Sequence, residues 1–367
     1  MPIGPNDAGS AGEPILAHPQ ARLLQTVTDE INGRTVSARR AGHLDWHHEL
    51  TVRGRLLGGW PSGRCSASGA CRILRSGDGW IAISLARPWD LEALPALVEG
   101  PVAEDPWAAL GCWVGARPGA NAVRRARLLD MAAAQFDSMA PDTPVPLSAT
   151  RRWPSRDVPD LSELQVVDLS SLWAGPLSAR VLSDAGAPVT KVESAARPDG
   201  ARGTPDFYRH LHPDEQSNVV VDLSSARGRA QLHELVEAAD VVIEASRPRA
   251  LEQLGSGPEQ VRPKSGRVWL SITGYGRRGP GANWIAFGDD AAVAGGLTAK
   301  NDTGEPVFCA DAVADPVTGL FGAAAVLRSL AAGGGHLIDL ALAGAAAAVA
   351  RAGTSESIEP LGPMWPS

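Results

Sequence analysis

Residues 165–193 read QVVDLSSLWAGPLSARVLSDAGAPVTKVE, and this stretch decides the fold class. Its first five residues, 165–169, include a β-branched apolar pair that is typical of a buried strand. The small residues of 174–185 predict a helix, and 188–193 predict a second strand. A strand, a helix and another strand in this order predict two parallel strands joined by a crossover helix.

The same alternation continues toward the C-terminus. Apolar runs predict strands at 218–223, 240–244, 267–272 and 336–340, with a helix at 225–238 and an alanine-rich helix after residue 340. Strands that alternate with helices favour an α/β fold with a doubly wound, Rossmann-like parallel sheet. Such sheets bind ligands at the carboxyl ends of their strands.

The N-terminal part is less regular and is separated from this pattern by prolines. A strand at 80–85 and helices at 89–99 and 122–136 predict a smaller α+β domain. Prolines 141, 144, 146, 154 and 159 indicate a stiff linker. We therefore expect a disordered lead-in at 1–16, a small domain at 17–139, a linker at 140–160 and a ligand-binding domain at 161–367.

Composition limits the partners. The net charge is −7, which disfavours nucleic acid, and no apolar run is long enough to cross a bilayer. No basic segment followed by an apolar one opens the chain, and its four cysteines form no CxxC pair. These features predict a cytoplasmic protein with reduced thiols that binds neither nucleic acid nor a membrane.

One aspartate stands out as a candidate nucleophile. In the stretch CADAVADPVTGL (309–320), Asp315 directly precedes a proline that is expected to open a helix. Aspartate before such a proline is also a common helix cap, and spacing alone favours that reading. The functional reading is that the helix keeps Asp315 ionised, so that its carboxylate can attack a thioester carbonyl.

Other stretches of the sequence give weaker indications of a ligand-binding site. Trp173 and Ala174 belong to the small-residue loop 172–177, which lacks the GxGxxG pattern of dinucleotide-binding folds. Several loop arginines follow predicted strand ends, where they can reach a phosphate. The adjacent His47 and His48 precede Glu49, but neighbouring side chains point apart and no third ligand is suitably spaced, so we expect no metal.

Five segments in order resemble the family III CoA-transferases, also called the CaiB/BaiF family. They are VVDLSSLWAGPLSARVLSDAGAPVTKVE (166–193), DGAR (199–202), ADVVIEASRPRALEQLG (239–255), SITGYGRRGP (271–280), and Ala314-Asp315 with Gly319. The region before residue 139 is similar to the small domain of that family, which normally follows the large domain. The resemblance therefore implies a permuted domain order.

The resemblance also implies a function. Asp315 would be the nucleophile, forming first an acyl-aspartyl anhydride and then an aspartyl-CoA thioester. CoA would be a substrate, and the partners would be an acyl-CoA and a carboxylic acid, in a homodimer whose chains can interlock. The residues implied to line the CoA site are Trp173, Ala174, Arg202, Arg247, Ala250, Gly274 and Tyr275.

Two alternatives stay open. An α-methylacyl-CoA racemase would need two bases; its histidine would fall near Ala286 or Phe287, where none occurs, although Asp289 or Asp290 can supply a base. A non-catalytic CoA-binding homologue is the other. It is favoured by departures from the family pattern, which has an arginine where this chain has Ser194, a basic residue where it has Gln216 and an asparagine–phenylalanine pair where it has Ala245-Ser246.

Overall fold

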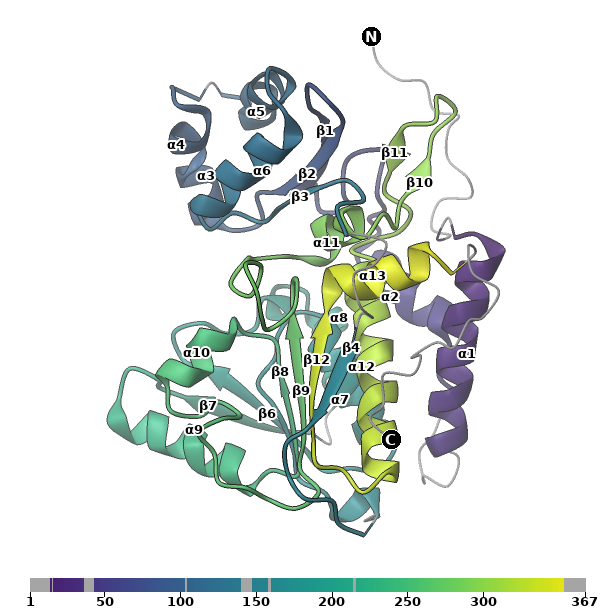
Figure 1. The fold of residues 1–367 in the computed structure, drawn as a ribbon, viewed down its shortest axis with the longest axis vertical. Helices are drawn as coiled ribbons and strands as arrows, with labels where there is room; N and C mark the ends of the chain where they lie inside the picture. The colour runs from purple at the N-terminus through teal and green to yellow at the C-terminus, as the bar shows by residue number, and fades with distance from the viewer. Residues whose placement is uncertain are drawn as a thin grey trace.

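The computed structural model describes residues 14, 16–35, 43–102, 104–139, 147–157, 160–213 and 216–352. Its largest element is a seven-stranded sheet in the order β4-β12-β9-β8-β5-β6-β7. The six strands other than β4 run parallel, and β4 pairs antiparallel with β12 at one edge (Figure 1). This mixed α/β architecture confirms the predicted fold class.

The six parallel strands of this sheet lie close to the predicted runs, whereas β4 was not predicted as a strand. Their bounds are β4 Leu147–Arg151, β5 Val166–Asp168, β6 Val189–Ser194, β7 Ser217–Val221, β8 Val241–Glu244, β9 Val268–Thr273 and β12 His336–Ala341. The neighbours of β5 are β6 on one side and β8 on the other, so the strand order reverses at β5. The loops after β5 and β8 therefore flank the position where doubly wound sheets bind ligands.

Helices cover both faces of the sheet because successive strand residues point to opposite sides. In β5, Val166 belongs to a core with α7 (Ala174–Asp184) and α12 (Ala314–Ala331). The next residue, Val167, packs instead in a core that includes Leu232 of α9 (Ala226–Ala238). The apolar run in the sequence is thus a strand buried on both faces.

A small antiparallel sheet lies apart from the large one (Figure 1). It consists of β1 (Cys71–Arg75), β2 (Trp80–Ser84) and β3 (Ala133–Gln135), accompanied by α3 (Pro88–Glu92), α4 (Leu94–Val98), α5 (Pro106–Gly115) and α6 (Gly119–Leu128). Strands β2 and β3 and helices α4–α6 share an apolar core around Ile81, Leu97 and Val123, whereas Ile73 of β1 packs with Val293. An α+β unit before the large sheet is what the sequence predicted.

Two predicted helices in this unit are wrong in extent. The segment 89–99 forms two short helices, because Pro95 lacks the N–H that would continue the first helix. The segment 122–136 is helical only as far as Leu128. Asp130 then takes a φ of 56°, outside the right-handed helical region, and the chain continues into β3.

Two N-terminal helices pack with the large sheet rather than with the small one. Leu24 of α1 (His18–Thr35) and Leu50 of α2 (Trp46–Leu57) are fully buried in the core that contains Val166. Figure 1 shows α1 alongside α12. The segment expected as one small domain, 17–139, thus divides between two cores.

The expected linker contributes structure as well, because β4 lies within it and forms the edge strand. Residues 140–146 and 158–159 of that linker, and the lead-in apart from residues 14 and 16, lie outside the described residues. The remaining elements are α8 (Pro205–Leu211), α10 (Pro248–Gln253), α11 (Gly288–Ala294), α13 (Leu342–Ala350) and the hairpin β10 (Ala299–Lys300) with β11 (Pro306–Val307). No helix of the described segments has the length and apolarity that a membrane span requires.

Candidate active site

Asp315 lies in the first turn of α12, as its second residue rather than as the cap. The chain enters the helix through Ala312, whose φ of 43° is in the left-handed region that alanine seldom adopts. The Ala312 N–H donates to Asp289 Oδ1 over 3.0 Å, which helps to hold this turn. Asp315 is partly exposed as a residue, although the surrounding protein desolvates its carboxyl group.

The glycine of the aspartate motif explains how α12 approaches α7. A Cβ atom on Gly319 would lie 2.8 Å from the carbonyl oxygen of Ala174, so only glycine fits. The Ser178 hydroxyl donates to the Gly319 carbonyl oxygen over 2.8 Å and ties the two helices together. Trp173 immediately precedes α7 and is buried. Close packing of the two helices thus brings the loop after β5 to the start of α12.

Arg53 of α2 joins this site from the N-terminal part of the chain. Its Nη1 lies 2.7 Å from Oδ1 and 2.6 Å from Oδ2 of Asp311, whose side chain is buried. Its guanidinium carbon lies 5.9 Å from the ring centroids of both Trp173 and Phe207. The indole and phenyl rings meet edge to face at 5.0 Å. Sequence analysis missed Arg53, because no motif surrounds it and α2 was assigned to the other domain.

The environment of Asp315 raises its pKa. Burial raises the pKa of the carboxyl to about 7, against the opposing effect of the Arg53 charge. The neighbouring carboxyls of Asp290 and Asp311 raise it further, and the backbone N–H of Gly288 lowers it. The helix start was expected to keep Asp315 ionised, but desolvation of the carboxyl outweighs the helix here. At neutral pH the Asp315 carboxyl is therefore about half ionised.

Two further carboxyls lie beside Asp315 and are buried. Asp290 accepts a hydrogen bond from the Ser84 hydroxyl over 2.8 Å and from the Phe287 N–H over 3.0 Å. Burial raises its pKa to about 7. The pKa of Asp289 is also raised, first by burial and then by the charge of Asp311. Both side chains are enclosed by protein, which limits their access to a substrate.

Arg202 lies beyond the carboxyl end of β6 and is paired within the fold. Its Nη2 lies 2.6 Å from Glu193 Oε1, and its guanidinium carbon lies 4.3 Å from the Tyr208 ring centroid. Although burial raises it, hydrogen bonds from Arg202, the Asp199 N–H and Tyr208 lower the pKa of Glu193 to about 2. About two-fifths of the Arg202 side chain remains exposed, so the guanidinium can still meet a ligand.

Arg247 and Ala250 lie at the start of α10, beyond the carboxyl end of β8. Arg247 Nη1 lies 3.1 Å from Asp130 Oδ1, and Asp130 belongs to the loop between α6 and β3 of the small unit. Ala250 is partly buried. Arg247, which was predicted to bind CoA, is therefore ion-paired with Asp130 of the small unit.

Gly274 and Tyr275 follow the carboxyl end of β9. A Cβ atom on Gly274 would lie 2.8 Å from Ala286 Cβ, which accounts for glycine there. The Tyr275 ring packs edge to face on Trp284 at 5.4 Å. The Arg127 guanidinium carbon of α6 lies 3.7 Å from the Trp284 ring centroid and 4.8 Å from that of Tyr275.

The structure thus brings Trp173, Ala174 and Asp315 together, and adds Arg53. The other predicted residues follow the carboxyl ends of β6, β8 and β9, as a doubly wound sheet requires of a ligand site. Their roles stay predictions. Among the described residues, one group could hold a metal ion: His48, Glu49 and His210.

A comparison with protein families identifies the part of the chain that holds these residues. Residues 161–359, more than half of the chain, match the model of CoA-transferase family III. The chain belongs to this family. The resemblance stated from its motifs is confirmed.

Several named proteins are similar to part of this chain. A succinate–glutarate CoA-transferase of Agrobacterium fabrum is 33% identical over 207 residues, covering 50% of this chain and 51% of that protein. A probable fatty acyl-CoA transferase of Mycobacterium tuberculosis is 32% identical over 182 residues, covering 46% of each. A crystal structure of a CaiB/BaiF family protein from Brucella suis is 30% identical, with a TM-score of 0.46, covering 51% of this chain and 54% of that one. This family III chain spans about half the length of the curated relatives it matches.

Proposed function

We propose that this chain transfers CoA from an acyl-CoA donor to a carboxylic acid, with Asp315 as the nucleophile. The observation that carries the proposal is the position of Asp315: a partly exposed residue at the start of α12, where this helix packs against the start of α7 after β5. Family membership and the similar CoA-transferases support CoA transfer in general terms.

The reaction consists of paired attacks at carbonyl carbons. A carboxylate oxygen of Asp315 attacks the thioester carbonyl carbon of the donor, and the C–S bond breaks to release CoA thiolate and leave an acyl-aspartyl anhydride. The thiolate then attacks the aspartyl carbonyl carbon, which releases the donor acid and leaves an aspartyl-CoA thioester. The acceptor carboxylate repeats these two steps in reverse order and leaves as its CoA thioester, restoring Asp315.

Arg53 gives this mechanism a source of positive charge. Only the ionised form of Asp315 is nucleophilic, and the Arg53 charge favours that form. A pKa of about 7 leaves a substantial ionised fraction at neutral pH and a carboxylate more basic than an ordinary aspartate. Arg53 acts on Asp315 through its charge and through Asp311, so it is a positioning residue rather than a catalytic one.

The CoA site is proposed at the carboxyl ends of β5, β6, β8 and β9. Arg202 and Arg247 both retain exposed surface there, which suits charge-assisted bonds to phosphates. The buried indole N–H of Trp173 has no hydrogen-bond partner among the described residues, and a ligand carbonyl would satisfy it. The departures at Ser194 and at Ala245-Ser246 reduce the number of charged or amide donors.

The racemase reading is disfavoured by burial. It would use Asp289 or Asp290 as a second base, but both side chains are enclosed, and the Asp290 side chain is hydrogen-bonded to Ser84 and Phe287. A base must approach the α-carbon of its substrate directly.

The homodimer and the cytoplasmic location stay predictions.

The test is to trap the aspartyl intermediate. The protein is incubated with a panel of acyl-CoA donors, treated with hydroxylamine and digested, and we expect mass spectrometry to find a hydroxamate on Asp315. Asp315→Asn should lower exchange of CoA between acids on the order of 1000-fold or more. Asp302→Asn, a change at an exposed aspartate of the β10–β11 hairpin, should not.

The alternatives give different results. Deuterium uptake at the α-carbon without CoA exchange would favour the racemase. CoA binding by calorimetry, with neither exchange nor a hydroxamate for any donor, would leave a binding protein and overturn the transferase proposal.

A further inference from the structure

Three side chains suited to binding a metal meet where α2 packs against α8. His48 and Glu49 lie on α2, and His210 lies on α8. Their ligand atoms all lie within 4.8 Å of one another. No metal was expected here, because the neighbouring His47 and His48 point apart and no third ligand is close in the sequence. His47 is not part of the group. The third ligand comes from 161 residues beyond Glu49, a separation that sequence spacing cannot reveal.

The donor atoms are spaced for a small divalent ion. His210 Nε2 lies 3.0 Å from Glu49 Oε2. Two ligands at about 2.0–2.2 Å from a tetrahedral Zn²⁺ lie about 3.3–3.5 Å apart, so a small side-chain movement lets both contact one ion. The rings of His48 and His210 have centroids 5.6 Å apart, which leaves room for an ion between their nitrogens. Two imidazoles and a carboxylate also make up the ligand set of many zinc sites.

The surrounding contacts fix the carboxylate and supply negative charge. Arg180 Nη2 lies 2.6 Å from Glu49 Oε1, the oxygen that does not contact His210. Outer contacts of this kind orient metal ligands. Arg180 is also shared with Asp184, at 3.4 Å, so two carboxylates share one guanidinium. The nearby Asp45 adds a third acid and caps α2.

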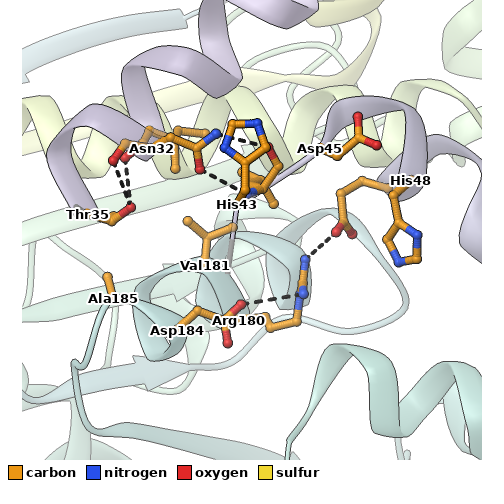
Figure 2. Close-up of a pocket in the computed structure, with 12 residues that line it drawn as sticks. Asn32, Thr35, His43, Asp45, His48, Arg180, Val181, Asp184 and Ala185 are labelled. Carbon is orange, nitrogen blue, oxygen red and sulfur yellow. Dashed lines mark hydrogen bonds and ion pairs between the residues drawn. The ribbon is translucent and has the colours of Figure 1, made fainter. Parts of the chain in front are cut away.

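The group is reachable from solvent. His48 and Glu49 line a cavity of about 300 Å³ between the α1–α2 segment and α7, together with Asp45 and Arg180. Figure 2 shows His48 of α2 and Arg180 of α7 lining this cavity, with Asp184 linked to Arg180. An ion with three protein ligands keeps a coordination position for water, and the cavity can supply that water.

We propose that His48, Glu49 and His210 bind one divalent transition-metal ion. Zn²⁺ suits the site best, because its usual ligands include histidine nitrogens and carboxylate oxygens. The ion joins α2 to α8. Arg53, one turn further along α2, and Phe207 on α8 both contact Trp173. Metal binding therefore stabilises the helix pair that carries these two residues, independently of whether the chain transfers CoA.

The test uses the full chain, stripped with a chelator and titrated with Co²⁺ and Zn²⁺. We expect one ion per chain by calorimetry, and a visible Co²⁺ absorption typical of four-coordinate sites that Zn²⁺ abolishes. Substitution of even an outer contact of a metal site costs about 10–100-fold in affinity, so His48→Gln and His210→Gln should each weaken Zn²⁺ binding at least about tenfold. His47→Gln, on the same turn of α2, is the matched control and should bind as the wild type does.

A second measurement needs no variant. Zn²⁺ should protect His48 and His210 of the wild-type chain from diethyl pyrocarbonate, mapped by mass spectrometry, and leave the modification of His47 unchanged. The proposal is overturned by the absence of saturable binding, by binding that persists in the double His48→Gln/His210→Gln variant, or by equal protection of all three histidines.

Discussion

The part of the chain that matches the family and the part that precedes it supply opposite charges to the site. The matched residues, 161–359, contribute the carboxyls of Asp290, Asp311 and Asp315. The cations that lower their pKa values come from the preceding part: Arg53 acts on Asp311 and Asp315, and Arg127 acts on Asp290. The site thus needs both parts of the chain, although the family motifs lie in only one.

The same division appears at the predicted CoA residues. Arg247 is paired with Asp130, and Tyr275 lies beside Arg127, so each matched residue contacts a partner from the small unit. A carboxylate cluster without nearby cations would be protonated at neutral pH, because burial disfavours the charged form. The contribution of the preceding part is therefore electrostatic, and substitutions can measure it.

Loss of the Arg53 cation should have the largest effect. Arg53→Met leaves the buried Asp311 carboxyl without its partner, and breaking a buried ion pair costs about 3–5 kcal/mol. We expect urea denaturation at pH 7 to show a loss of that size in the free energy of unfolding. The matched control is Arg55→Met, an exposed change on the same helix, which should shift stability by less than about 0.5 kcal/mol. Equal losses in the two variants would mean that the pair with Asp311 contributes nothing specific.

Truncation of a buried side chain between α1 and the large sheet should cause the next largest loss of stability. Leu24 is fully buried in the core that contains Val166, and truncation of such a leucine costs about 2–5 kcal/mol. Leu24→Ala should therefore lower the midpoint of urea unfolding, which tryptophan fluorescence measures. Leu56→Ala, at an exposed position of α2, should leave the midpoint almost unchanged. An unchanged midpoint for Leu24→Ala would show that α1 unfolds separately and that the two parts do not share one cooperative core.

What the sequence could predict follows the same division. The six parallel strands of the large sheet were predicted to within about two residues, because their apolar runs are a local signal. The edge strand β4 was not predicted, because it lies among the prolines of the expected linker. Asp315 was predicted from its motif, but its raised pKa was not, since burial is a property of the folded chain. Arg53 and His210 carried no local signal. Each acquires its role through contacts with residues far away in the chain.

The pH dependence of activity tests the electrostatic part of the comparison. The pKa of Asp315 is raised to about 7, and only its ionised form attacks, so kcat/KM should be half-maximal near pH 7, level off at higher pH and fall as pH decreases. The fall should approach tenfold per pH unit, or about 1.4 kcal/mol. In Arg53→Met the midpoint should move to higher pH, since the guanidinium lowers the pKa of Asp315. Assays from pH 5 to 9 measure this, and constant activity down to pH 5 would contradict it.

The smallest effect is expected from breaking the ion pair between Asp130 and Arg247, which joins the small unit to the large sheet. Asp130→Asn removes a negative charge 3.1 Å from Arg247, and both side chains are partly exposed. Exposed pairs contribute little to stability, so the chief result should be tighter CoA binding, by at most about fivefold, as Arg247 becomes available to a phosphate. Asparagine tolerates the positive φ of this position, which preserves the loop.

Calorimetry at low and high salt separates this effect from a change in shape. The gain in CoA affinity should shrink as salt screens the charges. Glu104→Gln, which removes an exposed charge elsewhere in the small unit, should give no comparable gain. A gain that is independent of salt, or that equals that of Glu104→Gln, would show that Asp130 does not compete for Arg247.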